Sequence, residues 1–420
     1  MTGRALPFAE FVVLIALMFS MIAFGTDAML PALPRIAGDL GLSDVNRAQL
    51  VITSFILGTG LGQLLTGPLS DSLGRKPVIT GGLLFFMLGC VLAMQAPTLG
   101  WMLVARIMQG IGVSAPRTVT LAMVRDQYAG RLMARVMSIA MVLFVLVPAV
   151  APLIGQSIAH SFGWRAIFLS FILFALVGAF WLNLRQPETL APERRRPLRA
   201  ATYGAAAREV LGSRVVMTYT LVLGAGLGAL FGYLSSAQQI YVETFGAGTD
   251  FPFYFAAIAL VSGSSGFVNA LLVMRLGMRL LAIIAISGLL VVSVAFALIL
   301  WKGDLGPDAL FRLFLLWSVI TFFAPGLTFG NLNALAMEPM GHVAGMASAI
   351  VGAVGTMLGA AIAVPIGLAF DGTPMPLAIG FIVCSAASLA LMLSNPKPPG
   401  GSSLRIAQAP PDRARSNTPP

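Results

Sequence analysis

The sequence contains few charged residues and few cysteines for its length. Charged residues make up 10% of the 420 positions, against about 25% in ordinary soluble domains, and hydrophobic residues make up 58%. This composition excludes a soluble globular fold. The two cysteines, Cys90 and Cys384, both lie inside apolar runs, so we expect two buried thiols and no disulfide.

Motifs of membrane enzymes, channels and ATP-driven pumps are also lacking. The two histidines, His160 and His342, stand near predicted helix ends with no cluster of metal ligands around them. We find no zinc motif, no paired acids, no Ser–His pair at membrane depth, no selectivity-filter repeat and no Gly-x-x-x-x-Gly-Lys loop. We therefore expect a protein that is not an enzyme and that holds neither a metal nor a cofactor.

Long apolar runs fill most of the chain. A membrane-spanning helix needs about 20 mostly apolar residues. The sequence has twelve such runs, near residues 9–31, 48–70, 77–95, 98–120, 136–158, 164–184, 215–238, 252–273, 280–301, 309–336, 344–369 and 375–393. They predict an all-α integral membrane protein with twelve transmembrane helices.

A stretch rich in Arg, Pro and Ala divides these spans into two sets of six. Residues 73–76 (Leu-Gly-Arg-Lys), after the second span, align with residues 276–279 (Leu-Gly-Met-Arg), after the eighth. The repeat predicts two pseudo-symmetric six-helix halves. We assign residues 1–184 to an N-terminal bundle, 185–213 to a cytoplasmic linker, 214–393 to a C-terminal bundle and 394–420 to a disordered cytoplasmic tail.

The basic residues are distributed unevenly between the two membrane faces. If the N-terminus is cytoplasmic, most of the 26 Lys and Arg lie on the cytoplasmic side, including Arg75, Lys76 and the arginines of the linker and tail. This is the positive-inside asymmetry. The net charge of +10 therefore reflects topology and contact with anionic lipid, and no nucleic-acid partner is expected. We predict a multi-pass protein of the inner (plasma) membrane with both termini in the cytoplasm.

Two charged side chains lie well inside predicted spans, where charge is costly and indicates function. They are Asp27 in the first span and Arg106 in the fourth. At 1.5 Å per residue, both lie roughly 8–12 Å below the outer surface. We expect them to form a pair that couples transport to proton binding; the alternative is a static ion pair that only fixes helix packing.

A charged turn, residues 67–77 (Gly-Pro-Leu-Ser-Asp-Ser-Leu-Gly-Arg-Lys-Pro), joins the second and third spans. We expect its Asp71 to meet the N-terminus of the eleventh span, near residues 341–344, since exposed helix N–H groups attract a carboxylate. This contact would form a gate at the cytoplasmic face. The predicted gating residues are Gly67, Asp71, Gly74, Arg75 and Lys76. The alternative for the two basic residues, and for Lys76 above all, is that they serve as topology anchors.

The fifth span contains Pro148, Pro152 and Gly155. Prolines bend a helix and a small residue allows a neighbouring helix to approach, although an ordinary proline kink is the alternative. Polar side chains within other spans are expected to face the interior because amides are costly against lipid. The predicted substrate cavity contains Met29, Gln63, Gln109, Asn269, Asn331 and Asn333; the last two could instead make helix–helix hydrogen bonds.

These motifs together resemble the major facilitator superfamily of transporters. Residues 67–77 resemble its signature between helices 2 and 3, and Arg106 with Gln109 and Gly110 resembles its helix-4 motif. Residues 24–34 (Phe-Gly-Thr-Asp-Ala-Met-Leu-Pro-Ala-Leu-Pro) and 151–155 (Ala-Pro-Leu-Ile-Gly) are similar to motifs of the bicyclomycin-resistance-like branch of drug:proton antiporters. The chain departs from these patterns at Ser72, Gln156 and residues 28–29.

The resemblance implies a secondary active transporter that exports small amphipathic compounds or antibiotics by alternating access, driven by a proton gradient. It implies that Arg106 takes part in proton coupling and that the fifth helix seals the closed interface. The alternative is a proton-coupled symporter or facilitator that imports a small metabolite. The expected partners are a small-molecule substrate, protons and membrane lipids, with the protein a monomer. The lone acid Asp27 suggests neutral or monocationic substrates.

Overall fold

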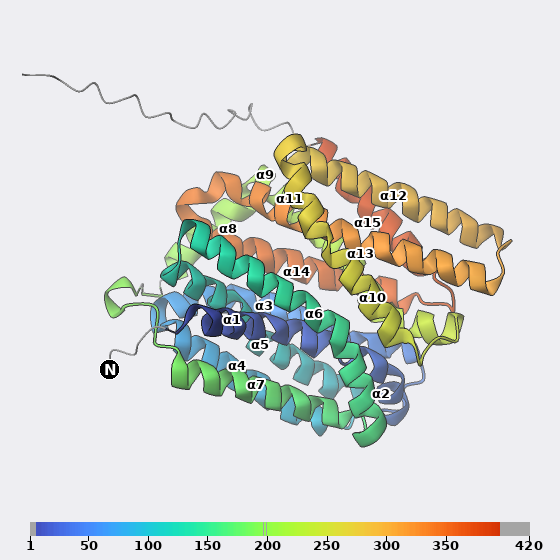
Figure 1. Cartoon of the computed structure of the whole chain (residues 1–420), viewed down its shortest axis with the longest axis horizontal. Helices are drawn as coiled ribbons and strands as arrows, with labels where there is room; N and C mark the ends of the chain where they lie inside the picture. Colours follow the sequence, from blue (N-terminus) through green and yellow to red (C-terminus); the bar gives the residue numbers. More distant parts are fainter. Residues whose placement is uncertain (1–5, 196, 199, 395–420) are drawn as a thin grey trace, which may run out of the picture.

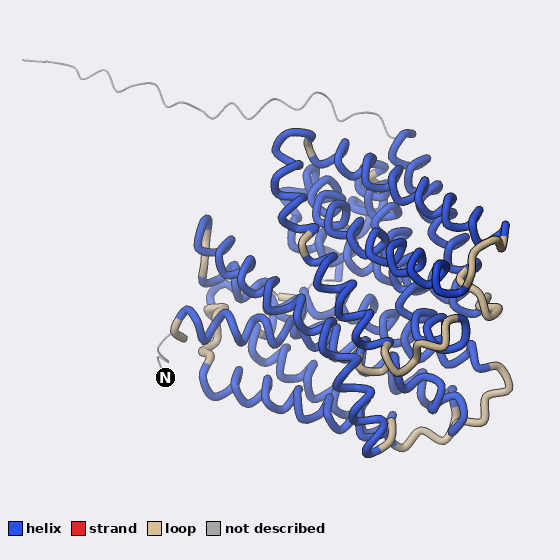
Figure 2. The backbone as a smooth tube through the Cα atoms, turned by 45° about the vertical axis from the view of Figure 1, so that its right-hand side comes forward, coloured by secondary structure: helices blue, strands red, loops and turns tan. Residues whose placement is uncertain are grey.

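The computed structural model describes residues 6–195, 197–198 and 200–394. In Figures 1 and 2 this part of the chain is helix joined by short loops. The tail predicted to be disordered lies, apart from Ser394, outside the described residues. In Figure 1 the helices of the first half (blue to green) lie below those of the second half (yellow to red), with their long axes roughly aligned.

From Leu6 onward, where the described residues begin, the N-terminal half contains seven α-helices and two short 3-10 helices. In chain order they are α1 (Phe8–Asp27), η1 (Leu30–Ala32), α2 (Leu33–Asp39), η2 (Val45–Gln49), α3 (Leu50–Leu73), α4 (Arg75–Met94), α5 (Leu99–Gln127), α6 (Gly130–Phe162) and α7 (Arg165–Arg185). The helix α2 extends the first predicted span beyond its expected end, after a 3-10 turn that contains Pro31.

The linker contains a helix of its own, and the C-terminal half follows it. The linker elements are η3 (Pro192–Arg194) and α8 (Ala200–Gly212), and α8 contacts α9 and α14. The second half consists of α9 (Arg214–Gln239), η4 (Ile240–Thr244), α10 (Phe251–Gly263), α11 (Ser265–Leu276), α12 (Met278–Lys302), α13 (Pro307–Met337), η5 (Glu338–Val343), α14 (Ala344–Leu368) and α15 (Met375–Ser394).

The described helices account for all twelve expected spans. Ten helical segments are long and apolar enough to cross a membrane, and one of them, Pro307–Leu368, contains both α13 and α14. The remaining span is α5, which is long enough but less apolar because it carries Arg106 and Arg117. The predicted span 252–273 is interrupted at Ser264, since consecutive Gly and Ser residues at 263–266 weaken a helix.

The repeat predicted from the sequence has a structural counterpart in both halves. Gly74 and Gly277 connect α3 to α4 and α11 to α12 with positive φ values of 109° and 78°, which glycine adopts without steric cost. Two residues later, Lys76 donates to the carbonyl of Asn183 in α7 and Arg279 to the carbonyl of Met392 in α15. In each half, this hydrogen bond connects the start of the third membrane-spanning helix (α4 or α12) to the end of the sixth (α7 or α15).

Candidate functional site

Arg106 joins three helices in the interior of the N-terminal half. Its side chain is fully buried and its guanidinium donates to the carbonyl of Val51 in α3 at 3.0 Å, to the carbonyl of Gly25 in α1 at 2.9 Å and to Oε1 of Gln109 at 2.7 Å. It also lies 4.2 Å from the ring centre of Phe55. Two backbone carbonyls and one side-chain amide oxygen therefore accept the hydrogen bonds of this buried cation.

The expected ion pair between Asp27 and Arg106 is absent from the part of the chain that the structure describes. Gly25 and Asp27 are two residues apart on α1, so they point about 200° apart around the helix axis. Arg106 meets the Gly25 carbonyl and not the carboxylate. Asp27 is 4% exposed, and among residues 6–195, 197–198 and 200–394 it has no hydrogen-bond or ion-pair partner.

Gly155 of α6 packs directly against the residue that follows Asp27. A methyl group at position 155 would lie 1.9 Å from the carbonyl oxygen of Ala28, a distance that no side chain can occupy. α6 also contacts α10 of the C-terminal half. The glycine of the fifth-helix motif therefore brings the buried acid close to a helix that contacts both halves.

Amide side chains close one end of the molecule. We call this the far end; it contains the turns at residues 40–49, 245–250 and 369–374. Asn46 donates to the carbonyl of Phe370 at 2.8 Å, and Gln239 of α9 donates to Oδ1 of Asn46 at 2.9 Å. Gln49 donates in turn to Oε1 of Gln239. These bonds join η2 of the first half to the second half.

The opposite end contains a cavity between the two halves. We call it the linker end, because the described residues of the linker lie there with the turn at Gly74. The cavity has a volume of about 340 Å³, within the range of sites for drug-sized ligands. Its lining comes from α3, α4, α5, α8, α13 and α14 and includes Gln63, Arg117, Tyr203, Asn333 and Ser348.

The charged turn lies at the mouth of this cavity, which Asp71 and Arg75 both line. Arg75 contacts the carboxylate of Asp71 at 2.5 Å and that of Asp126, in α5, at 3.0 Å. The cavity also borders Gly345 at the start of α14, and no described bond joins Asp71 to that helix. The contact predicted to close this end is therefore open here, while the far end is closed.

Two acids of this network were not expected from the sequence. Besides Asp126, the linker residue Glu188 accepts hydrogen bonds from the backbone N–H groups of Arg75 and Lys76, both at 3.0 Å, and so caps the N-terminus of α4. A side chain at Gly74 would come within 2.8 Å of this carboxylate. Asp126 and Glu188 lie a few residues beyond the predicted spans 98–120 and 164–184, and no motif in the sequence marks them.

Comparison with known proteins identifies the family. The family model of the Major Facilitator Superfamily matches residues 14–364. The chain belongs to this superfamily. It is 29% identical over 365 residues to a bicyclomycin resistance protein homolog of Haemophilus influenzae, covering 84% of this chain and 88% of that one. It is 30% identical over 377 residues to a chloramphenicol resistance protein of Pseudomonas aeruginosa, covering 81% of each.

The fold comparison agrees with this assignment. The crystal structure of a D-xylose–proton symporter superposes with a TM-score of 0.71 over 91% of this chain and 96% of that one, at 16% identity. The major facilitator fold with two six-helix halves is therefore confirmed, as is the resemblance to the bicyclomycin-resistance-like branch.

The predicted cavity residues of this transporter separate into two groups. Gln63 and Asn333 line the linker-end cavity. The other four do not: Met29 is fully buried in the core, Gln109 bonds to Arg106 and to the carbonyl of Gly89, and Asn331 donates to Asn269 at 2.8 Å. The last pair is a helix–helix hydrogen bond between α13 and α11, the alternative that the sequence left open for Asn331.

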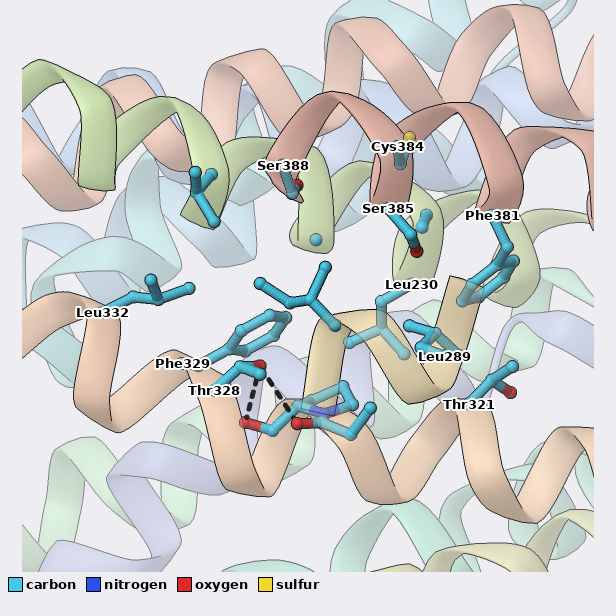
Figure 3. Close-up of a pocket in the computed structure, with 16 residues that line it drawn as sticks. Leu230, Leu289, Thr321, Thr328, Phe329, Leu332, Phe381, Cys384, Ser385 and Ser388 are labelled. Atoms are coloured by element: carbon cyan, nitrogen blue, oxygen red, sulfur yellow. Dashed lines mark hydrogen bonds between the residues drawn. The ribbon is translucent and has the colours of Figure 1, made fainter. Parts of the chain in front are cut away.

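A second cavity, inside the C-terminal half, is shown in Figure 3. It is lined by α9, α12, α13 and α15, with Thr328, Phe329, Phe381 and Ser385 among its residues. Its volume of about 40 Å³ accommodates little more than one water molecule. This cavity is therefore too small for a drug-sized compound, whereas the cavity between the halves at the linker end, at about 340 Å³, has the size of a drug-binding site.

Proposed function

We propose that this protein exports small amphipathic compounds, antibiotics among them, in exchange for protons. The names of two relatives, a bicyclomycin resistance protein homolog and a chloramphenicol resistance protein, support export. The observation that carries the coupling is Asp27, a buried carboxyl group with no cation partner among the described residues. Such a group can bind or release a proton without breaking an ion pair.

Alternating access would connect the two ends through this acid. In the present structure the far end is closed by the Asn46–Gln239 contacts and the linker end is open to the cavity. A substrate would enter the cavity from the linker end, which we place in the cytoplasm of an inner-membrane protein together with both termini. Opening of the far end would release it and let an external proton reach Asp27. No cofactor is required, and we expect a monomer in contact with membrane lipids.

Arg106 would not bind the proton itself. It would instead hold the part of α1 that carries Asp27 in place. It holds the carbonyl of Gly25, two residues before Asp27, against α3 and α5. A change in the protonation of Asp27 that moved α1 would therefore strain the bonds of Arg106. This arrangement supports a role for Arg106 in coupling while the acid alone changes charge.

The experiment that tests this function measures proton movement in inside-out vesicles with an acid interior and a panel of antibiotics. We expect some compounds to release the gradient with the wild-type protein and none with Asp27→Asn. The matched control is Asp250→Asn, which removes an exposed carboxylate at the far end and should behave as wild type. Release of the gradient by Asp27→Asn at the wild-type rate would refute coupling through this acid. Uptake of substrate with protons would favour the symport alternative.

A further inference from the structure

The linker-end cavity contains cations that the ion pairs of the charged turn leave uncompensated, and one of them, Arg117, lies deep in the cavity. Three basic residues line it, Arg75, Arg117 and Arg125, with two acids, Asp71 and Asp126. Both acids contact Arg75, at 2.5 and 3.0 Å. These pairs leave two of the three lining cations without an acid partner among the described residues: Arg117 and the exposed Arg125 in the last turn of α5.

Arg117 lies deeper than this network. It is ten residues before the end of α5 at Gln127, which corresponds to about 15 Å along the helix axis. Its side chain is exposed to the cavity. Within residues 6–195, 197–198 and 200–394, no hydrogen bond, ion pair or ring contact involves its guanidinium.

The helix geometry directs Arg117 toward the interior of the transporter. Arg106 and Arg117 are eleven residues apart, close to three full turns, so they lie on the same face of α5. Arg106 on that face contacts α1 and α3. The two arginines differ in their surroundings: carbonyl oxygens satisfy Arg106, whereas an open cavity faces Arg117.

Neutral polar and apolar groups complete the surroundings of Arg117. The cavity lining places Gln63 of α3, Asn333 of α13 and Ser348 of α14 around the same space, and Leu121 and Met346 add apolar surface. A cation at membrane depth is costly unless it is paired, and a guanidinium forms two parallel hydrogen bonds to a carboxylate, sulfonate or phosphate group.

We propose that Arg117 is an anion-binding residue of the substrate site and that the transported compounds include amphipathic organic anions. The inference rests on the proposed export function and specifies its substrate class. It replaces the neutral or monocationic substrates that Asp27 alone suggested. The anionic group would bind Arg117, and the apolar part of the compound would contact Leu121 and Met346.

The test uses a pair of fluorescent probes with the same aromatic skeleton. They are 1-anilinonaphthalene-8-sulfonate, which carries an anionic group, and N-phenyl-1-naphthylamine, which lacks it. Binding of each is measured by equilibrium dialysis to the purified full-length protein in an uncharged detergent, for the wild type, Arg117→Gln and Arg117→Lys. The control Arg47→Gln removes one exposed positive charge at the far end.

We expect Arg117→Gln to weaken sulfonate binding by about tenfold or more. Arg117→Lys should bind with intermediate affinity, because lysine keeps the positive charge but cannot form the two parallel hydrogen bonds. Binding of the neutral amine should be the same in all variants, which also shows that the cavity remains folded. Arg47→Gln should match the wild type with both probes. Unchanged sulfonate binding in Arg117→Gln would overturn the proposal, as would an equal loss of the neutral probe.

A lipid headgroup could supply the same anionic chemistry as a soluble substrate. Short-chain phosphatidylglycerol and phosphatidylcholine are therefore added as competitors. If phosphatidylglycerol displaces the sulfonate and phosphatidylcholine does not, a lipid headgroup is an occupant of the site. If neither lipid displaces it, a soluble anion is favoured. Both results support the anion site. Because the assay needs no proton gradient, its outcome is independent of the vesicle experiment. Sulfonate binding without proton movement would refute the exporter and leave the anion site standing.

Discussion

Replacing Gln239 by methionine tests whether amide hydrogen bonds hold the far end closed. The substitution keeps the length of the side chain but removes the bond that Gln239 accepts from Gln49 and the bond that it donates to Asn46. A hydrogen bond contributes about 1 kcal/mol net, so the two lost bonds correspond to about 2 kcal/mol. The ratio of far-end-closed to far-end-open molecules should fall by roughly 30-fold.

Spin labels at Val45 and Thr373 report this change, because these exposed positions lie at the far end in different halves. The native Cys90 and Cys384 are buried and should not react with the label. Double electron–electron resonance of Gln239→Met should show a new population at longer distance. The matched control, Thr244→Val, removes a far-end hydrogen bond to the carbonyl of Gly372 that stays within one half. A distance distribution of Gln239→Met equal to that of the control would refute the gate.

Two further substitutions test contacts described above. Gly155→Ala should lower stability by about 1–3 kcal/mol and impair proton-coupled export, because the methyl group would meet the Ala28 carbonyl at 1.9 Å; Gly81→Ala, in open space, is the control, and equal melting temperatures would contradict the close packing. Glu188→Ala removes the cap of α4 and should cost about 0.5–2 kcal/mol. A thermal shift no larger than that of the exposed Glu193→Ala would show that the cap contributes nothing.

Hydropathy and length were sufficient to predict the twelve spans, because each must cross about 30 Å of hydrocarbon. The break at Ser264 could not be predicted, since Gly and Ser pairs weaken a helix without always interrupting it. The rotation of a helix about its own axis cannot be predicted from the sequence either. Asn331 and Asn333 are two residues apart on α13, so they face different sides, and only packing decides that Asn333 lines the cavity while Asn331 bonds to Asn269.

The site could be predicted as a set of charged residues but not as a set of contacts. Asp27 and Arg106 stand out because each is a charge inside an apolar run. The prediction that they pair with each other was wrong, because Arg106 donates to the carbonyls of Gly25 and Val51 instead. Every residue carries a backbone carbonyl, so no sequence pattern marks these acceptors. Arg117 was visible as an arginine in the same span, but its uncompensated charge depends on where the acids of other helices lie.

The two ends of the transporter are built from chemically different contacts. They should therefore respond differently to the salt concentration of the surrounding solution. The far-end contacts between the halves involve side-chain amides and backbone carbonyls at Asn46, Gln239 and Phe370. Amides do not titrate in the physiological range and are barely affected by ionic screening. At the linker end, Asp71, Arg75 and Asp126 carry full charges. If the far end faces the exterior, the amide contacts that join the two halves there would therefore be less sensitive to external salt than the ion pairs at the linker end.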